Sequence, residues 1–448
     1  MITRIRRKNG LTNDGAARNR NRSIKKVLLI FWAVVFAGGQ ATILPAVDIY
    51  LSLSSHAMRS AIGIGGFYPL TPSVEEAKIG RQIQGVITDD LLFSRYFNVA
   101  EGGPQYSGKN EEIKAWSTLA VSVLAAGNIK LKGKKLNLTA KLFDVENSQV
   151  IFEKAFSGDV SDYRYLAHAI SDEIVKHITG ENGIAHSKIV FSNNRTGNKE
   201  LYLVDYDGYN LRKLTNDESI DILPKWSPKG DEIIFTTYRY GNPDLYAIST
   251  LTGRCRAVST HQGINTSASF SPDGETIALT ESRGATPNLF LIDKTGKFLK
   301  RLTLGSDIST SPSFAPNGKE IIFVSDAPGY PQLEMMDIDV GSIKTIYTDG
   351  IVDSPAWSPR GDKIAFVMRL GRQDYDAYVY DLASTNISRL TQQEGSNENP
   401  SWSSDGRFLV FSSNRSSKRE LYVMAVDGSG ARKLVTMEGD SSTPSWSP

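Results

Sequence analysis

The side chains of this sequence that could do chemistry recur at the start of a repeated segment. Each segment carries carboxylate, amide or hydroxyl groups shortly before an aromatic residue. Such groups can hydrogen-bond a polar partner, and several carboxylates together could hold a cation. The six segments are IDILP (220–224), GINTSA (263–268), SDISTSP (306–312), IVDSP (351–355), NENP (397–400) and GDSSTP (439–444). Their candidate binding residues are Asp221, Asn265, Thr266, Asp307, Thr310, Asp353 and Glu398.

Familiar catalytic motifs fit this sequence poorly. The string GPQYSGKN (103–110) resembles a phosphate-binding loop, but Asn110 stands where a hydroxyl should ligate Mg²⁺, so we expect a polar loop before a helix. No G-x-S-x-G string is present, which removes the nucleophile elbow of the α/β-hydrolases. The five histidines form neither an i, i+4 pair nor an HExxH motif, which argues against zinc. We expect His168 and His177 at the surface or edge of a helix.

Composition narrows the class of protein further. A chain of 448 residues can form two or three domains, and its single cysteine, Cys255, excludes an internal disulfide and any CxxC site. We expect Cys255 to be an ordinary strand residue. The net charge is +2, yet residues 1–26 alone hold nine Lys and Arg against one Asp, so the remainder is slightly acidic. A broad nucleic-acid footprint is therefore not expected.

The N-terminal stretch is typical of an export signal. Lys25 and Lys26 precede the apolar run VLLIFWAVVFAG (27–38), which is too short to span a bilayer as a helix. Small residues follow, so cleavage near 41 or 46 is expected, with residues 1–46 as the signal peptide. An uncleaved anchor and an ordinary buried helix are the alternatives.

An internal repeat dominates the second half of the chain. The anchors WSPKG (226), FSPDG (270), FAPNG (314), WSPRG (357), WSSDG (402) and WSP (446) are spaced by 44, 44, 43, 45 and 44 residues. Each unit reads as four short antiparallel strands, which is one propeller blade. We predict an all-β six-bladed β-propeller over residues 188–448. Its C-terminal strand, STPSWSP (442–448), is expected to be the innermost strand of the blade whose other three strands lie at 188–215.

Residues 47–180 lack the repeat and are predicted to form an N-terminal α/β domain. Strands are expected at 47–53, 61–67, 121–130, 135–145 and 149–156, and helices at 73–96, 111–120 and 162–180. Gly180 is expected to end the last helix. Residues 181–187 are the predicted linker.

The topology predicts a polar, mostly acidic mouth on the propeller. Each candidate segment enters an innermost strand from the same face, so its side chains should surround one axis. Solvated turn residues without a partner are the alternative for each position, and a cation held by the carboxylates is a further one.

Several strings resemble the TolB family of the Tol-Pal system of Gram-negative bacteria. They are DYRYLAHAISDEIVKHITG (162–180), VDYDGYN (204–210), IGIGGF (62–67) and DDLLFSRYFNV (89–99), together with the repeated SPDG, LYxxD and RxLT. One repeat departs from the pattern with SSDG in place of SPDG. The likeness covers nearly the whole chain after the signal.

The resemblance implies a periplasmic scaffold without catalytic activity or cofactor. It implies that the propeller mouth binds the peptidoglycan-associated lipoprotein Pal, through a surface that includes Asn265 and Thr310. It also implies that the N-terminal segment binds the C-terminal domain of TolA. That segment is expected to begin with Val47, Asp48, Ile49, Tyr50 and Leu51. The family supports outer-membrane integrity and cell division, and we expect a monomer that does not insert into the membrane.

An enzyme is the competing hypothesis. Similar propellers precede α/β-hydrolase domains in prolyl-oligopeptidase-type enzymes, and a lyase could use a metal bound at the rim. Because the sequence stops where such a hydrolase domain would begin, we expect a binding protein instead.

Overall fold

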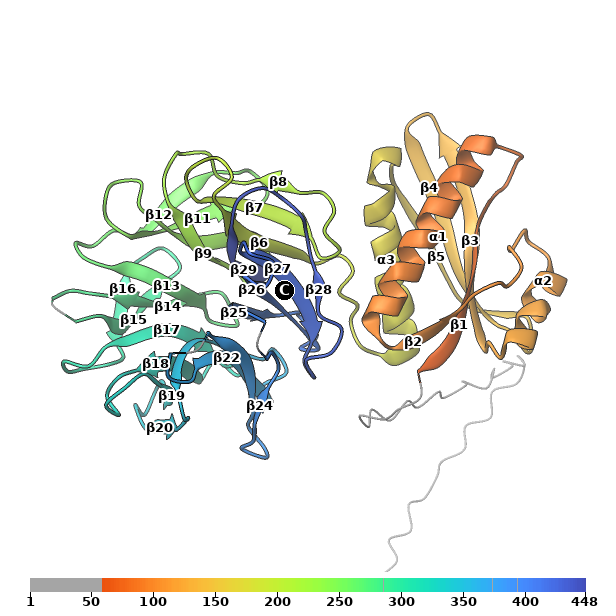
Figure 1. Ribbon diagram of the computed structural model, residues 1–448. Helices are drawn as coiled ribbons and strands as arrows, with labels where there is room; N and C mark the ends of the chain where they lie inside the picture. The colour runs from red at the N-terminus through yellow and green to blue at the C-terminus, as the bar shows by residue number, and fades with distance from the viewer. Residues whose placement is uncertain (1–58, 285, 373, 393) are drawn as a thin grey trace, which may run out of the picture. The chain divides into compact units, whose positions relative to one another are not determined.

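The structure is a computed structural model that describes residues 59–448, apart from positions 285, 373 and 393 (Figure 1). The predicted signal peptide and the predicted TolA-binding residues 47–51 lie outside this range. None of the helices it describes is long and apolar enough to cross a membrane. The described chain forms an N-terminal α/β domain and a β-propeller, as the sequence predicted.

The N-terminal domain is built on one five-stranded sheet with the order β2-β1-β3-β4-β5. β1 is parallel to both β2 and β3, whereas β3, β4 and β5 follow one another antiparallel. The strands are β1 (Ser60–Pro69), β2 (Phe97–Ala100), β3 (Val123–Lys132), β4 (Lys135–Asp144) and β5 (Gln149–Asp159). The short strand β2 was not predicted, because its four residues follow directly on a helix.

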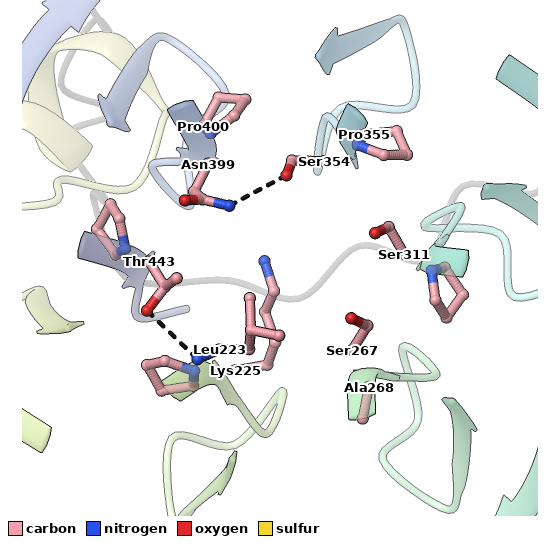
Figure 2. Close-up of a pocket in the computed structure, with 13 residues that line it drawn as sticks. Leu223, Lys225, Ser267, Ala268, Ser311, Ser354, Pro355, Asn399, Pro400 and Thr443 are labelled. Atoms are coloured by element: carbon pink, nitrogen blue, oxygen red, sulfur yellow. Dashed lines mark hydrogen bonds between the residues drawn. The ribbon is translucent and has the colours of Figure 1, made fainter. Parts of the chain in front are cut away.

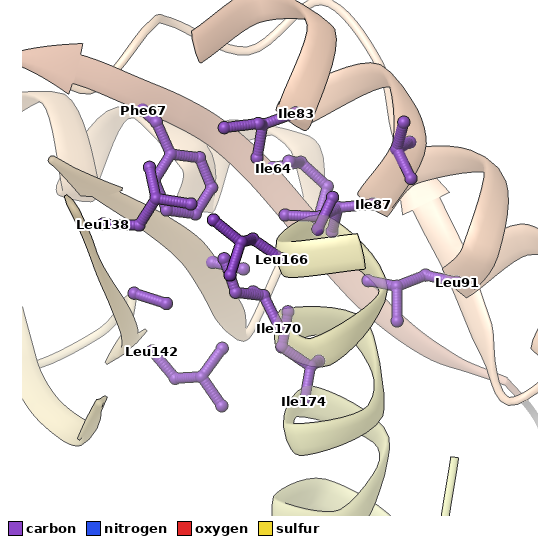
Figure 3. Packing of buried hydrophobic residues seen from close by; sticks show 14 of the residues in the cluster. Ile64, Phe67, Ile83, Ile87, Leu91, Leu138, Leu142, Leu166, Ile170 and Ile174 are labelled. Atoms are coloured by element: carbon purple, nitrogen blue, oxygen red, sulfur yellow. The ribbon is translucent and has the colours of Figure 1, made fainter. Parts of the chain in front are cut away.

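Two long helices, α1 (Val74–Ser94) and α3 (Tyr163–Thr179), cover one face of this sheet (Figure 3). The Ser73 hydroxyl caps α1 by accepting a hydrogen bond from the Glu76 N–H at 3.3 Å. Gly180 ends α3 with φ 77°, the left-handed conformation that favours glycine at a helix C-terminus. Apolar side chains from both helices meet those of the sheet, among them Ile83, Ile87, Leu91, Leu166, Ile170 and Ile174.

The opposite face of the sheet is covered by a loop and a short helical segment. Leu124 and Ala126 of β3 point to this side because successive side chains of a strand alternate between faces. They pack with Trp116 of the 3-10 helix η1 (Trp116–Leu119), which follows α2 (Asn110–Ala115). The Trp116 indole N–H donates to the Pro104 carbonyl at 3.2 Å. The string at 103–110 is therefore packed against its own following helix, in agreement with its interpretation as a polar loop.

The propeller consists of six four-stranded antiparallel sheets (Figure 1). In five of them the chain runs from the innermost strand outward. Two are β9 (Asp221–Trp226), β10 (Glu232–Thr237), β11 (Asp244–Ser249) and β12 (Cys255–Ser259), and β13 (Asn265–Phe270), β14 (Thr276–Glu281), β15 (Asn288–Asp293) and β16 (Phe298–Arg301). The other three are β17 (Ser309–Phe314), β18 (Glu320–Ser325), β19 (Gln332–Asp337) and β20 (Ile343–Ile346); β21 (Ile351–Trp357), β22 (Lys363–Arg369), β23 (Asp376–Asp381) and β24 (Ile387–Arg389); and β25 (Asn397–Trp402), β26 (Phe408–Ser413), β27 (Glu420–Ala425) and β28 (Arg432–Lys433).

The sixth sheet joins the two ends of the repeat. Its order is β29-β6-β7-β8, from β29 (Ser441–Trp446), β6 (Lys188–Asn193), β7 (Glu200–Asp205) and β8 (Arg212–Lys213). β29 pairs antiparallel with β6, with Trp446 opposite Ile189. Figure 1 shows β29 beside β6 although they are far apart in sequence. The prediction that the last strand completes the first blade is confirmed.

A bulge interrupts every innermost strand at the same place. In each one the ladder register shifts, and one residue has a left-handed backbone with φ between 49° and 56°. Bulges bend a strand and redirect its side chains, so they turn this position toward the propeller axis. These six residues, the bulge ring, are Leu223, Ser267, Ser311, Ser354, Asn399 and Thr443.

Candidate binding surface at the propeller mouth

The ladder registers place one residue of each innermost strand in an equivalent position just before the bulge. Each pairs with the second strand of its own blade, for example Thr310 with Val324 and Glu398 with Ser412. Five of these side chains are half-buried and Asp353 is exposed. We call this set the mouth ring: Ile222, Thr266, Thr310, Asp353, Glu398 and Ser442. The structure therefore brings four of the seven predicted site residues into one ring.

Two predicted site residues lie one position earlier and are buried. Asp221 and Asn265 are both 0% exposed, because neighbouring residues of a strand point to opposite sides. The Asn265 amide donates to the His261 carbonyl at 2.6 Å and its oxygen accepts from Ser259. The expectation that these two side chains are exposed at the rim was wrong, and Asn265 instead holds the segment before its strand in place. Asp307 lies in the exposed loop ahead of β17.

The two acids of the mouth ring have different electrostatic surroundings. Asp353 is exposed to solvent, but the protein around it raises the pKa of its carboxyl group through burial, despite hydrogen bonds from the Ser354 N–H at 2.6 Å and the Ser311 hydroxyl at 3.4 Å. Burial also acts on Glu398, but hydrogen bonds from Arg419 and Ser396 outweigh it and lower the pKa of Glu398. The Arg419 guanidinium lies 2.6 Å from the Glu398 carboxylate. The Asp353 carboxylate is thus the more available hydrogen-bond acceptor for a partner.

The bulge ring follows the mouth ring along the innermost strands, and its side chains surround the channel (Figure 2). It encloses a cavity of about 50 Å³. Two hydrogen bonds join its members across neighbouring blades: the Asn399 amide donates to the Ser354 hydroxyl at 3.0 Å, and the Leu223 N–H donates to the Thr443 hydroxyl at 3.3 Å. The mouth is therefore a polar depression whose floor is held by hydrogen bonds between neighbouring blades.

The cation that was kept as an alternative for the mouth has no cluster of ligands in the described part of the mouth ring. Within residues 59–448, as far as they are described, two groups of three His, Asp or Glu side chains lie close enough to hold a metal, and neither includes a mouth-ring residue. One of them joins Asp221 to Glu200 and Asp217. There Lys213 lies 3.2 Å from Glu200 and the Arg239 guanidinium bonds Asp217, so protein cations already neutralise two of the three acids.

Other sequence predictions concern isolated side chains. His168 is 2% exposed and its Nδ1 lies 2.9 Å from the Asp90 carboxylate, so the expectation of a surface position was wrong. Burial alone would lower the pKa of His168, but the hydrogen bond and charge of Asp90 outweigh burial and raise it. His177 is exposed and Cys255 lies at the start of β12, exposed, as predicted.

Comparison with known families assigns both parts of the chain. The family model described as TolB beta propeller domain matches residues 175–448, more than half of the sequence, and the TolB amino-terminal domain model matches residues 59–151. The chain belongs to the TolB family. The resemblance inferred from the repeated motifs is thereby confirmed.

Relatives within the TolB family match over part of their length. A Tol-Pal system protein TolB of Syntrophotalea carbinolica is 36% identical over 162 residues, 34% of this chain and 38% of the relative. One of Geobacter sulfurreducens is 37% identical over 163 residues, 35% of this chain and 38% of the relative. The matched stretch thus spans less than half of each relative. A crystal structure of TolB from Acinetobacter baumannii shares the fold with a TM-score of 0.74 at 23% identity, covering 87% of this chain and 97% of that chain.

One residue that lines the channel was not identified from the sequence. Lys225 lines the floor of the mouth, two residues after the bulge position Leu223. Aligning the repeats would have found it, because the equivalent position in the other five is serine or alanine.

Proposed function

We propose that this chain is a non-catalytic periplasmic scaffold of the Tol-Pal system. It binds the lipoprotein Pal at the propeller mouth and the C-terminal domain of TolA through an N-terminal segment. In this role it supports outer-membrane integrity and cell division. Membership of the TolB family supports the assignment to the Tol-Pal system, since the relatives described above are named as its components.

The observation that carries the Pal proposal is the mouth ring. Six equivalent positions surround one axis, and four of them are Thr266, Thr310, Asp353 and Glu398, with half-buried or exposed side chains. Such a concave polar surface over a rigid floor suits a protein partner, because little conformational freedom is lost on binding. An interface of standard size would bury about 800 Å² on each partner, which requires loops beyond the ring, including the one with Asp307.

The non-catalytic part of the proposal rests on the family and on the chemistry of the ring. Its members are hydroxyl, carboxylate and aliphatic side chains, without the histidine or cysteine that most often serves as base or nucleophile. Asp353 and Glu398 are suited to accepting hydrogen bonds from a partner.

The mouth is tested by bulky substitutions in two neighbouring blades. Thr310→Trp and Asp353→Trp should each weaken binding of purified Pal at least tenfold in calorimetric titration, about 1.4 kcal/mol, through steric conflict at the ring. Lys319→Trp is the matched control, since Lys319 is exposed in the turn at the other end of β17. All three variants should melt within a few degrees of the parent. Unchanged Pal affinity in both ring variants would contradict the assignment of the mouth.

The N-terminal segment is tested separately. Deleting residues 47–51 from the exported chain should abolish binding of the TolA C-terminal domain while leaving Pal affinity within about twofold. This part of the proposal rests on the family resemblance, because residues 47–51 lie outside the described range. Retained TolA binding after the deletion would refute it without affecting the mouth assignment.

A further inference from the structure

A single lysine interrupts a ring of small residues at the waist of the propeller channel. The ladders align one residue of each innermost strand, paired for example as Lys225 with Ile234 and Ser313 with Ile322. We call these six residues the waist ring: Lys225, Ser269, Ser313, Ala356, Ser401 and Ser445. Five of them are Ser or Ala, so Lys225 alone extends a long charged side chain into the space that the others leave open.

Lys225 has no ion-pair partner among the described residues. No carboxylate of the described chain lies within 4 Å of its ammonium group. Burial is the sole cause that lowers the pKa of Lys225 to about 8. At neutral pH the side chain is therefore mainly protonated and remains an uncompensated cation inside the protein.

No other charged side chain lines the space on either side of Lys225. The cavity beneath the mouth, about 50 Å³, and the wider cavity at the opposite end, about 390 Å³, are both lined by Lys225. The side chains of all other lining residues of both are uncharged: serine, threonine, asparagine, proline, alanine, leucine, phenylalanine and tryptophan. Figure 2 shows the Lys225 side chain reaching toward the middle of the bulge ring.

Serine hydroxyls of the waist ring are free to donate into the same space. The Ser313 hydroxyl accepts a hydrogen bond from the backbone N–H of Trp357 at 3.0 Å, and the Ser401 hydroxyl accepts one from the backbone N–H of Trp446 at 3.0 Å. A hydroxyl that accepts such a bond keeps its own proton for another acceptor. Neither proton has an acceptor among the described residues, so these donors and the Lys225 ammonium surround the same channel.

We propose that the waist ring is a binding site for a small carboxylate anion, held by the Lys225 ammonium and by serine hydroxyls. One ammonium balances one negative charge, and two carboxylate oxygens can accept from the ammonium and a hydroxyl at once. A monovalent ion the size of acetate fits the space next to Lys225. It enters through the wider cavity, which offers more room than the cavity beneath the mouth.

The site is independent of the proposed function. It lies at the waist of the channel, and binding there requires neither Pal nor TolA. The positive charge of the Lys225 ammonium also repels a metal cation, so we do not expect a metal to bind at this point of the propeller axis.

The test replaces chloride by acetate at constant ionic strength and follows the melting temperature of the full chain. At pH 7 the parent should melt at a higher temperature as acetate rises, since a ligand that binds only the folded state stabilises it. The shift should vanish at pH 9.5, where Lys225 is neutral. In parallel, the apparent pKa of Lys225, read from its ¹³Cε chemical shift, should rise when acetate is present.

Two variants and one control make the result specific. Lys225→Ser, which introduces the residue of four other blades, should fold and lose the acetate response, whereas Lys225→Arg should keep it at both pH values. Lys229→Ser removes an exposed lysine three residues from Trp226 and should respond like the parent. An equal acetate response in Lys225→Ser would overturn the proposal. A parent melting temperature that does not change when acetate replaces chloride would overturn the choice of a carboxylate.

Discussion

Trp446 allows closure of the propeller to be measured by a single substitution. It is 4% exposed and belongs to β29, the strand that joins the C-terminus to β6. Its indole N–H donates to the Ser187 hydroxyl at 2.7 Å, and its backbone N–H donates to the Ser401 hydroxyl of the neighbouring blade at 3.0 Å. The side chain packs in a cluster with Ile189, Phe191 and other residues of the two joined blades. Trp446→Ala therefore removes contacts that exist only because the ring is closed.

The magnitude follows from burial and from the lost hydrogen bond. Replacing a buried tryptophan by alanine lowers the free energy of unfolding by about 3–5 kcal/mol, through lost burial and the cavity left behind. Leaving the Ser187 hydroxyl without its donor adds about 1 kcal/mol. For a propeller of this size each kcal/mol lowers the melting temperature by about 2–4 °C, so we expect a decrease on the order of 10 °C.

Urea titration followed by circular dichroism, together with calorimetry, measures the effect. Trp446→Phe keeps most of the apolar contact and should cost about 1–2 kcal/mol. Trp226→Ala is the matched comparison, because Trp226 occupies the equivalent position in the next blade but is only half-buried, so its cost should be smaller. Removing residues 441–448 should abolish the cooperative transition of the propeller, because β6 becomes an open edge. A truncated chain that melts like the parent would refute ring closure.

Three further substitutions bring an unusual residue back to what the repeat carries elsewhere. Burial raises the pKa of Asp221 to about 6, so Asp221→Asn should raise the free energy of unfolding by up to about 3 kcal/mol at pH 7, and the gain should vanish below about pH 4 in urea titrations. Leu223 has a left-handed backbone with φ 54°, so Leu223→Asn should raise the melting temperature by an amount equivalent to about 0.5–1 kcal/mol, and a decrease would contradict backbone strain there. Ala356→Ser should supply Trp402 with the hydroxyl acceptor that Ser313 provides to Trp357, a gain of about 0.5–1 kcal/mol in calorimetry that Ala356→Gly should not reproduce.

The repeat made the propeller predictable in detail. A spacing near 44 residues and an aromatic anchor in each unit predict the number of blades, and the incomplete last unit predicts which strand closes the ring. The mouth ring follows from the same spacing, since equivalent positions of a repeat occupy equivalent places around the axis. The long helices of the N-terminal domain were predicted from the periodicity of their apolar residues, with Gly180 as the expected end of the second helix.

The predictions of site residues failed where a shift of one residue along a strand decides whether a side chain is exposed. Asp221 and Asn265 are adjacent to mouth-ring positions but point into the blades, because a shift of one residue reverses the face of every side chain. The bulge that follows them was not predicted because Ser, Asn, Thr and Leu occupy it in place of glycine, although a proline comes directly after it in five of the six strands. His168 was misjudged because its partner Asp90 lies 78 residues away in sequence, beyond the reach of any local pattern.

Two charged departures from the repeat lie in one strand, β9, and together they predict an unusual pH dependence. Asp221 is protonated in the folded state up to about pH 6, and above this pH it is charged in the folded and the unfolded state. The free-energy cost of burying its charge therefore reaches its full value above pH 6. Lys225 is charged in both states below about pH 8, so its penalty is complete below pH 8 and is relieved as the pH rises further. Both penalties therefore act fully between pH 6 and pH 8, the range in which most proteins are most stable. The Asp221→Asn, Lys225→Ser double variant should gain most stability over the parent in that window and progressively less outside it, in urea titrations at low acetate. A gain that is equal at pH 4, 7 and 10 would show that these two charges are not what sets the difference.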